Sequence, residues 1–501
     1  MLATINDTEL RPRMIGCWLG KAVGGTLGMP YEGVREVLNL TYYDPVPEEM
    51  LPNDDLDLQV IYAFLLDRMG DRPHVDRRAL CAAWEYIGMS PDEYGIVKRN
   101  LKLGLRAPEC GAYDNPFVRG MGAAIRTELW ACLAPGNPDL AVKYAYEDAC
   151  MDHADEGIDA AVFLAALESL AFIERDRDRL LDAALLYLPG HADSELAAAI
   201  IDTRAWWEAT GDWREVQHRL AEAYLNDNFT DVVINLAYVV LGWLAGQDFG
   251  EAICIAVNCG QDTDCTGATL GALLGILDPE GIDDRWLEPI GRDLVLSPCV
   301  RGVENPPTLD GFTDLVLDLR RRIHADPPPL PRADPDPRAW RDLGVPVRKA
   351  WADHPATDTA SPPDFGDAEP TVLPGCYVET VAERGGVLRM AYRVTIAEAQ
   401  RIHVMFNTPQ PVRVWWQDRL IIDSAGGSFV PALHRTRPKD QIAGLSADAG
   451  TFDLMVELQS PGAGQPLRWC VAVADDAPGE DGWPVGRNWL TDAFERVTSV
   501  Y

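Results

Sequence analysis

The sequence is poor in basic residues and has no long hydrophobic run. Its 44 lysines and arginines stand against 78 aspartates and glutamates, which gives a formal net charge of −34. This balance excludes a broad positive surface for nucleic acid or anionic lipid. The longest uncharged apolar stretch, 232–247, is too short for a membrane span and indicates a buried helix. We therefore expect neither a nucleic-acid nor a membrane partner.

Several common functional signals are also missing. Residues 1–16 lack the apolar segment of a signal peptide, and the eleven cysteines form no CxxC pair. Reduced thiols and a cytoplasmic location are therefore expected. None of the eight histidines lies within five residues of another, which excludes an HExxH zinc site. The segment from Gly16 to Ala22 resembles a phosphate-binding loop only superficially, because it is one residue short and ends in alanine.

Residues 1–325 carry a helical pattern. Apolar residues recur three and four positions apart in stretches that are mostly rich in alanine and leucine, which indicates amphipathic helices. These stretches are Leu140–Ala149, Ile158–Glu174, Ser194–Thr210, Arg214–Tyr224 and Thr230–Ala245. There is no repeat in the range of roughly 20–50 residues that is typical of solenoids, so we expect one compact helical bundle.

The pattern changes after residue 325. Residues 326–370 contain eleven prolines and many aspartates, which is typical of a semi-rigid linker or strap. Over 371–501 the hydrophobic period becomes two, for example along 452–458, and glycine pairs separate the runs. The predicted fold is an all-α domain over 1–325, a linker, and a small antiparallel β-sandwich that resembles carbohydrate-binding modules.

Two acidic clusters stand out in the helical part. The first, 53–57, reads Asn-Asp-Asp-Leu-Asp and precedes an apolar run; capping of a helix N-terminus is one interpretation of it. The second, 262–266, reads Asp-Thr-Asp-Cys-Thr and lies between two strongly apolar segments. Carboxylates there are costly unless a cation or a proton joins them. Oxygen ligands favour Mg²⁺, with Ca²⁺ or Mn²⁺ as alternatives to it, and one or two ions are expected.

Three ordered motifs give the sequence a family resemblance. They are Gly16-x-x-Leu19-Gly20-x-Ala22-x-Gly24-Gly25-x-x-Gly28-x-Pro30-x-Glu32, then Asn53-Asp54-Asp55, then Gly260-Gln261-Asp262-Thr263-Asp264. In this order they resemble the ADP-ribosylglycohydrolase family over roughly residues 10–300. The resemblance implies an all-α fold, a metal centre that usually holds two Mg²⁺ ions, and hydrolysis at the anomeric carbon of ADP-ribose.

The resemblance also assigns site residues. It implies metal ligands at Asn53, Asp54, Asp55, Asp262 and Asp264, with Cys265 in the position next to the last of them. It implies catalytic roles for Glu32, Asp55 and Asp264, and substrate-binding roles for Gly122, Ala123, Arg126 and His153.

The chain departs from the family pattern close to these residues. The family usually has Ser or Thr at the position of Asn53 and Thr at the position of Leu56. Cys265 replaces another Thr, and Gly25 replaces a common aspartate. A thiol is a soft and weak ligand for Mg²⁺, so one metal position is expected to be altered. We infer a divergent branch with a different leaving group or sugar.

These observations predict a metal-dependent hydrolase that cleaves a glycosidic bond at an ADP-ribosyl or related ribose-like furanosyl unit. One alternative is a glycosidase for a non-nucleotide furanosyl O-glycoside, which would explain the sandwich and the altered motifs. Another is a non-catalytic protein that binds ADP-ribose or a sugar. The expected ligand is a small molecule or a glycoside, and the sequence has no signal for an oligomeric state.

Overall fold

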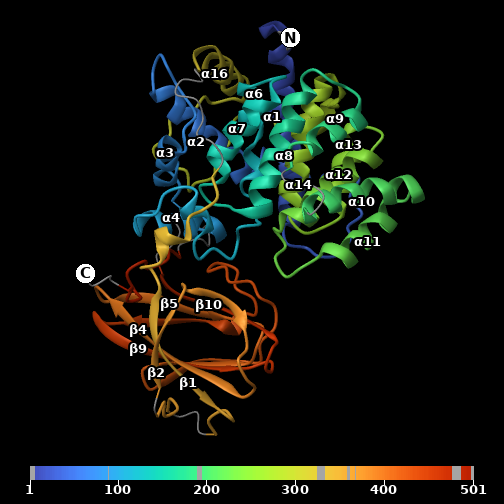
Figure 1. Cartoon of the computed structure of the whole chain (residues 1–501). Helices are drawn as coiled ribbons and strands as arrows, with labels where there is room; N and C mark the ends of the chain where they lie inside the picture. The colour runs from blue at the N-terminus through green and yellow to red at the C-terminus, as the bar shows by residue number, and fades with distance from the viewer. Residues whose placement is uncertain are drawn as a thin grey trace. The chain divides into compact units, whose positions relative to one another are not determined.

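The computed structural model describes residues 6–88, 90–188, 194–323, 333–357, 361–366, 368–476 and 487–497. The chain divides into two compact units, of which the first comprises Met1–Gly88 and Val118–Ala333 and the second Met89–Phe117 and Asp334–Tyr501. Figure 1 shows the first unit as helical and the second as rich in strands. This confirms the predicted order of an all-α part followed by antiparallel β-sheets. No helix among the described residues has the length and apolar character needed to cross a membrane.

The first unit consists of helices joined by loops and short 3₁₀ turns. Its α-helices are α1 (Asp7–Gly28), α2 (Asp54–Arg68), α3 (Arg77–Leu80), α6 (Glu128–Leu133), α7 (Pro138–Ala149), α8 (Asp155–Ala171), α9 (Arg177–Leu185), α10 (Glu195–Thr210), α11 (Trp213–Tyr224), α12 (Val232–Ala245), α13 (Phe249–Asn258), α14 (Thr263–Leu277), α15 (Asp284–Leu287) and α16 (Leu309–Arg322). The predicted helical stretches fall on α7, α8, α10, α11 and α12. Asparagine, aspartate or serine side chains cap several of the N-termini, as Ser194 does for α10 and Asp231 for α12.

Helices α1 and α14 form the closest helix pair of this unit. Gly16, Gly20 and Gly24 of α1 face Gly275, Gly271 and Gly267 of α14. A Cβ atom on Gly24 would lie 1.9 Å from the carbonyl oxygen of Gly267. The glycine stripe of α14 thus admits α1 at close range. The backbones touch directly, so this contact holds the C-terminal end of α1 against the N-terminal end of α14.

The described residues of the second unit form two antiparallel sheets and two α-helices. The helices are α4 (Asp92–Lys102) and α5 (Glu109–Ala112). The strands are β1 (Val345–Ala352), β2 (Glu369–Leu373), β3 (Tyr377–Val381), β4 (Val387–Ile396), β5 (Gln400–Asn407), β6 (Val412–Trp416), β7 (Arg419–Ser424), β8 (Ile442–Ala447), β9 (Gly450–Gln459) and β10 (Pro466–Asp475). One sheet has the order β2-β1-β4-β9-β6-β7 and the other β3-β10-β5-β8. Their inner faces supply one apolar core, as expected for a sandwich.

The predicted domain boundaries differ from those of the structure in two places. Residues 324–332, which include the start of the predicted linker, lie outside the described residues. Within the predicted linker 326–370, however, the structure has β1 and the start of β2. Val345 and Val347 are buried in the sandwich core. Their period-two pattern is too short to stand out among the surrounding prolines, so the sequence did not predict this strand. The segment 89–117, which we assigned to the helical domain, belongs to the strand-rich unit, where Ile96 and Phe117 join its core.

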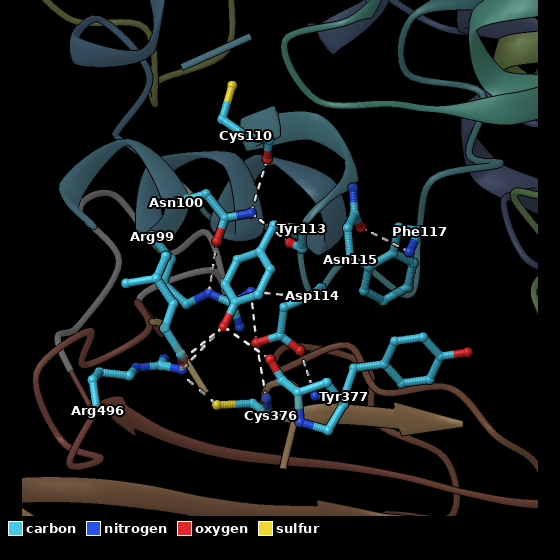
Figure 2. A network of polar contacts seen from close by, with 12 residues as sticks. Arg99, Asn100, Cys110, Tyr113, Asp114, Asn115, Phe117, Cys376, Tyr377 and Arg496 are labelled. Carbon is cyan, nitrogen blue, oxygen red and sulfur yellow. Dashed lines mark hydrogen bonds and ion pairs between the residues drawn. The ribbon is translucent and has the colours of Figure 1, made fainter. Parts of the chain in front are cut away.

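A polar network attaches 89–117 to the strands of its own unit (Figure 2). The Asp114 carboxylate accepts hydrogen bonds from the backbone N–H groups of Cys376, at 2.9 Å, and Tyr377, at 2.5 Å. Arg99 forms an ion pair with Asp114 at 3.1 Å, and the Tyr113 hydroxyl donates to the Leu343 carbonyl at 2.8 Å. Asp114 and its partners Cys376 and Tyr377 lie far apart in the sequence, and such a pairing leaves no local sequence pattern. The attachment of 89–117 to the strands therefore could not be predicted.

Candidate functional site

The N-terminus of α2 presents the first acidic cluster. Asn53 is the N-cap, and its side-chain oxygen accepts a hydrogen bond from the Asp55 N–H at 2.8 Å. Asp55 is buried, whereas Asp54 is half-buried. Asp57 is also buried, but one of its oxygens accepts from the Ser297 N–H at 3.0 Å. Asn53 therefore caps the helix, as the capping interpretation predicts. The Asp55 side chain instead points into the protein interior, where other side chains hold it.

A buried lysine supports Asp55. The Lys21 ammonium lies 3.2 Å from an Asp55 oxygen and 2.8 Å from a Glu128 oxygen. Gln59 donates to the other Glu128 oxygen at 2.9 Å and to the Asp55 carbonyl at 2.8 Å. Although burial lowers the pKa of Lys21, the carboxylates of Glu128 and Asp55 outweigh this effect and raise it, so the lysine is charged. The second oxygen of Asp55 accepts no hydrogen bond from the described residues.

The N-terminus of α14 presents the second acidic cluster. The chain enters it through Gly260 and Gln261, both with left-handed backbone conformations at φ +78° and +69°. Gln261 exchanges backbone hydrogen bonds with the segment after α1: its carbonyl accepts from Gly33 at 2.8 Å and its N–H donates to Val34 at 2.7 Å. The Thr263 hydroxyl donates to the Gly28 carbonyl at 2.8 Å. These bonds hold Glu32, which follows the 3₁₀ turn Met29–Tyr31, beside the start of α14.

The structure brings four of the five predicted carboxylates together in two groups, and Asp54 belongs to neither. In one, Glu32, Asp262 and Asp264 offer ligand atoms that all lie within 4.8 Å of one another. In the other, Asp55, Asp264 and Cys265 do the same. Asp264 is common to both groups. Three of these carboxylates are buried, whereas Glu32 is exposed, so the cluster opens to solvent at Glu32.

The electrostatics of this cluster fit a divalent cation. Burial raises the pKa values of Asp262 and Asp264 well above the usual range, and the nearby Glu32 carboxylate raises them further. One oxygen of Asp264, like one of Asp55, is buried and accepts no hydrogen bond from the described residues. Buried carboxylates with unused lone pairs and mutual repulsion are stabilised by a cation placed between them. The residues present therefore suit one or two hard ions, with Asp264 as the shared ligand.

Cys265 and Asn53 have different prospects as ligands. Burial raises the pKa of the Cys265 thiol well above its usual range, and Asp262 and Asp55 raise it further, so the sulfur stays protonated. A neutral thiol is a poor partner for Mg²⁺. The Asn53 amide nitrogen lies where a Cβ atom on Gly25 would approach it to 2.7 Å. A side chain at position 25 would therefore require the amide end of Asn53 to shift.

The residues predicted to bind substrate lie in the interior. Gly122, Ala123, Arg126 and His153 are all buried. Arg126 forms ion pairs with Asp148 at 2.9 Å and Asp152 at 2.7 Å. His153 Nδ1 lies 2.9 Å from an Asp152 oxygen. The guanidinium of Arg126 is fully enclosed and ion-paired, and its role in substrate binding stays a prediction.

Arg126 and His153 favour the ionised form of the Asp152 carboxylate. Burial alone would raise the pKa of Asp152, but Arg126 and then His153 outweigh it and lower the pKa to about 2. Arg126 also donates to the Gly122 carbonyl at 2.9 Å, and Trp130 donates to Asp148 at 3.0 Å. The hydrogen bond from the Arg126 guanidinium to the Gly122 carbonyl thus holds the backbone of 122–126 in place.

Sequence reasoning missed Lys21, Gln59 and Glu128. The available signal was a lysine on an otherwise apolar and glycine-rich helix, since a buried lysine requires a carboxylate partner. Glu128, more than a hundred residues away, had no signal of this kind.

Comparison with known proteins places the helical unit in a family. The model of the ADP-ribosylglycohydrolase family matches residues 6–322, which is more than half of the chain. An uncharacterized protein of Archaeoglobus fulgidus is 27% identical over 291 residues, covering 54% of this chain and 89% of that protein. A solved chain described as an ADP-ribosylglycohydrolase-related protein complex is similar to 63% of this chain over 99% of its own length, with 23% identity and a TM-score of 0.45. The chain belongs to the ADP-ribosylglycohydrolase family.

Proposed function

We propose that the protein is a divalent-metal-dependent hydrolase that cleaves a glycosidic bond at the anomeric carbon of an ADP-ribosyl or related furanosyl unit. The observation that carries the proposal is the pair of ligand groups that share Asp264 and open to solvent at Glu32. Family membership supports hydrolysis of this bond type. The eleven cysteines are all free, which supports a reducing compartment such as the cytoplasm.

The residues of the cluster have distinct roles in this proposal. Asp55, Asp262 and Asp264 would hold the ions, which would supply Lewis acidity and fix the hydroxyls of the sugar. Their negative charge would offset the positive charge that develops on an oxocarbenium-like transition state. Glu32 is the exposed carboxylate of the cluster, and we assign to it the removal of a proton from the attacking water. Lys21 would keep Asp55 oriented toward the ions.

A furanoside glycosidase without a nucleotide is the second candidate, and one observation favours it. The pyrophosphate of an ADP-ribosyl substrate is usually bound by arginine, lysine or helix N-termini. Lys21, which contacts Asp55, and the predicted substrate-binding residue Arg126 are both buried and already ion-paired with carboxylates. Neither can serve a pyrophosphate without leaving buried acids uncompensated.

A substrate panel separates these functions. The full chain would be incubated with ADP-ribosylated protein, ADP-ribose derivatives and aryl furanosides in Mg²⁺, and again after chelation with EDTA. Release of ADP-ribose that requires Mg²⁺ would support the first candidate. Turnover of aryl furanosides alone would support the second. Tight binding of ADP-ribose or a sugar without turnover of any substrate would establish the non-catalytic alternative and contradict the proposal.

Changing Glu32 to glutamine tests its assigned role. We expect kcat to fall about 10²–10⁴-fold, because the amide cannot transfer a proton, while the remaining carboxylates retain metal binding. The measurement is kcat and its pH dependence on the substrate found with the panel. The acidic limb of the pH profile should disappear in the variant. Unchanged kcat would remove Glu32 from the mechanism.

A further inference from the structure

The strand-rich unit contains a large cleft that the proposed hydrolysis does not use. Its volume is about 710 Å³, within the range of roughly 300–1,000 Å³ that is common for small-molecule sites. The side chains that line it and carry its chemistry are Lys349, Trp351, Asp364, Glu369, Glu383 and Arg389. All of them belong to the second unit, so the cleft is a property of that unit alone.

The cleft arises where two neighbouring strands differ in length. β2 pairs with β1 only from Val345 to Lys349, because β2 begins at Glu369. Beyond this point β1 continues to Ala352 and pairs only with β4. Successive residues of a strand point to opposite faces, so Trp351 shares a face with Val345 and Val347, which are buried in the core. Trp351 thus lies on the same face of β1 as the core valines but is only half-buried, because β2 does not extend beside it.

A second, smaller cavity of about 200 Å³ is lined partly by the same side chains, Lys349, Trp351 and Glu383. Its other lining residues include Leu388 of β4 and Leu467 and Trp469 of β10, which come from the two different sheets. The indole of Trp351 therefore borders both spaces, one at the sheet edge and one between the sheets. A flat aromatic surface with polar groups around its rim is the arrangement that proteins use for amphipathic ligands.

The positive charges of the cleft are already engaged. Lys349 forms an ion pair with Glu383. Arg389 pairs with Glu457 at 2.9 Å and donates to the Asp364 carbonyl at 2.9 Å. The carboxylates of Asp364 and Glu369 add negative charge on the same rim. A phosphate or carboxylate ligand would be repelled here, whereas the hydroxyls of a neutral ligand would find charged acceptors and donors.

We propose that this cleft binds a neutral glycan, with a sugar ring stacked on Trp351 and its hydroxyls bonded to the carboxylates and cations of the rim. The glycan would hold the enzyme close to a carbohydrate or glycosylated substrate. Binding here does not depend on the metal cluster of the first unit. The two proposals can therefore fail separately.

Affinity electrophoresis of the full chain tests the site. Native gels would contain soluble arabinogalactan, arabinoxylan or galactomannan, and a gel with hyaluronate would represent an anionic glycan. The protein would carry Asp264→Asn and the gels would contain EDTA, so that the metal cluster contributes no binding. We expect at least one neutral polysaccharide to retard migration and hyaluronate to have no effect.

Variants then locate the binding. Trp351→Ala should weaken the apparent affinity at least tenfold, and Trp351→Phe should keep most of it because a ring remains. Trp213→Ala removes a half-exposed tryptophan of α11 in the other unit and should leave the retardation unchanged. Circular dichroism of each variant shows whether it folds; should Trp351→Ala not fold, Glu369→Gln takes its place with the same expected direction. Equal retardation of the cleft variants and the parent, or no retardation by any neutral polysaccharide, would overturn the proposal.

Discussion

Replacing Asp264 by asparagine is expected to lower the hydrolytic rate by about 10³-fold or more, which corresponds to about 4 kcal/mol of lost transition-state stabilisation. Asp264 is the one carboxylate common to both ligand groups, so the change weakens every ion position that the cluster offers. Burial and neighbouring carboxylates already raise its pKa, and a neutral amide of similar size removes that repulsion. The metal-free variant should therefore be at least as stable as the parent.

Thermal unfolding with and without Mg²⁺ measures this effect separately from activity. The parent should gain stability with rising Mg²⁺ concentration, and Asp264→Asn should gain little or none. Asp57→Asn is the matched control, because Asp57 is as buried as Asp264 but lies in the first turn of α2, belongs to neither ligand group and can still accept from Ser297 as an amide. Stabilisation by Mg²⁺ that is equal in the parent and Asp264→Asn would contradict the assignment.

Replacing Gly24 by alanine is expected to destabilise the helical unit by about 3 kcal/mol or more, at the upper end of overpacking effects. The new Cβ would lie 1.9 Å from the Gly267 carbonyl oxygen and 2.8 Å from the Ala268 nitrogen. Both are backbone atoms, so α1 and α14 must move apart. Since Glu32 follows α1 and Asp264 begins α14, the affinity for Mg²⁺ should fall together with the stability.

Calorimetric unfolding and Mg²⁺ titration of the variant measure the two consequences. Gly385→Ala is the control, because a Cβ atom at Gly385 meets nothing within 4 Å and its backbone conformation suits any residue. It should leave both quantities nearly unchanged. An undisturbed unfolding temperature in Gly24→Ala would mean that the direct backbone contact between α1 and α14 does not hold the cluster in place.

Much of the candidate site could be predicted because its chemistry lies in short motifs. Asp262 and Asp264 stand between apolar segments, and that contrast marks buried charge in the sequence itself. What surrounds them could not be predicted in the same way. The pairing of Lys21 with Glu128 joins positions that are far apart, and the fit of Asn53 against Gly25 depends on the angle between two helices.

The fold shows the same division. Periodicity predicted the helices of the first unit and the strands after residue 371, since each buries one face. The segment 89–117 was predicted to be helical and part of the first domain. Its place in the strand-rich unit depends on Asp114, whose partners Cys376 and Tyr377 follow more than 250 residues later. β1 was hidden because its two core valines stand among prolines and charged residues.

Crystals of the full chain soaked in Mn²⁺ and measured at the manganese absorption edge test the central claim most directly. The account predicts two anomalous peaks, one near Glu32 and Asp262 and one near Asp55, with Asp264 contacting both ions. A single peak at Asp264 would reduce the centre to one ion and assign the lost position to Cys265. No peak at this cluster, at Mn²⁺ concentrations that saturate activity, would contradict the account.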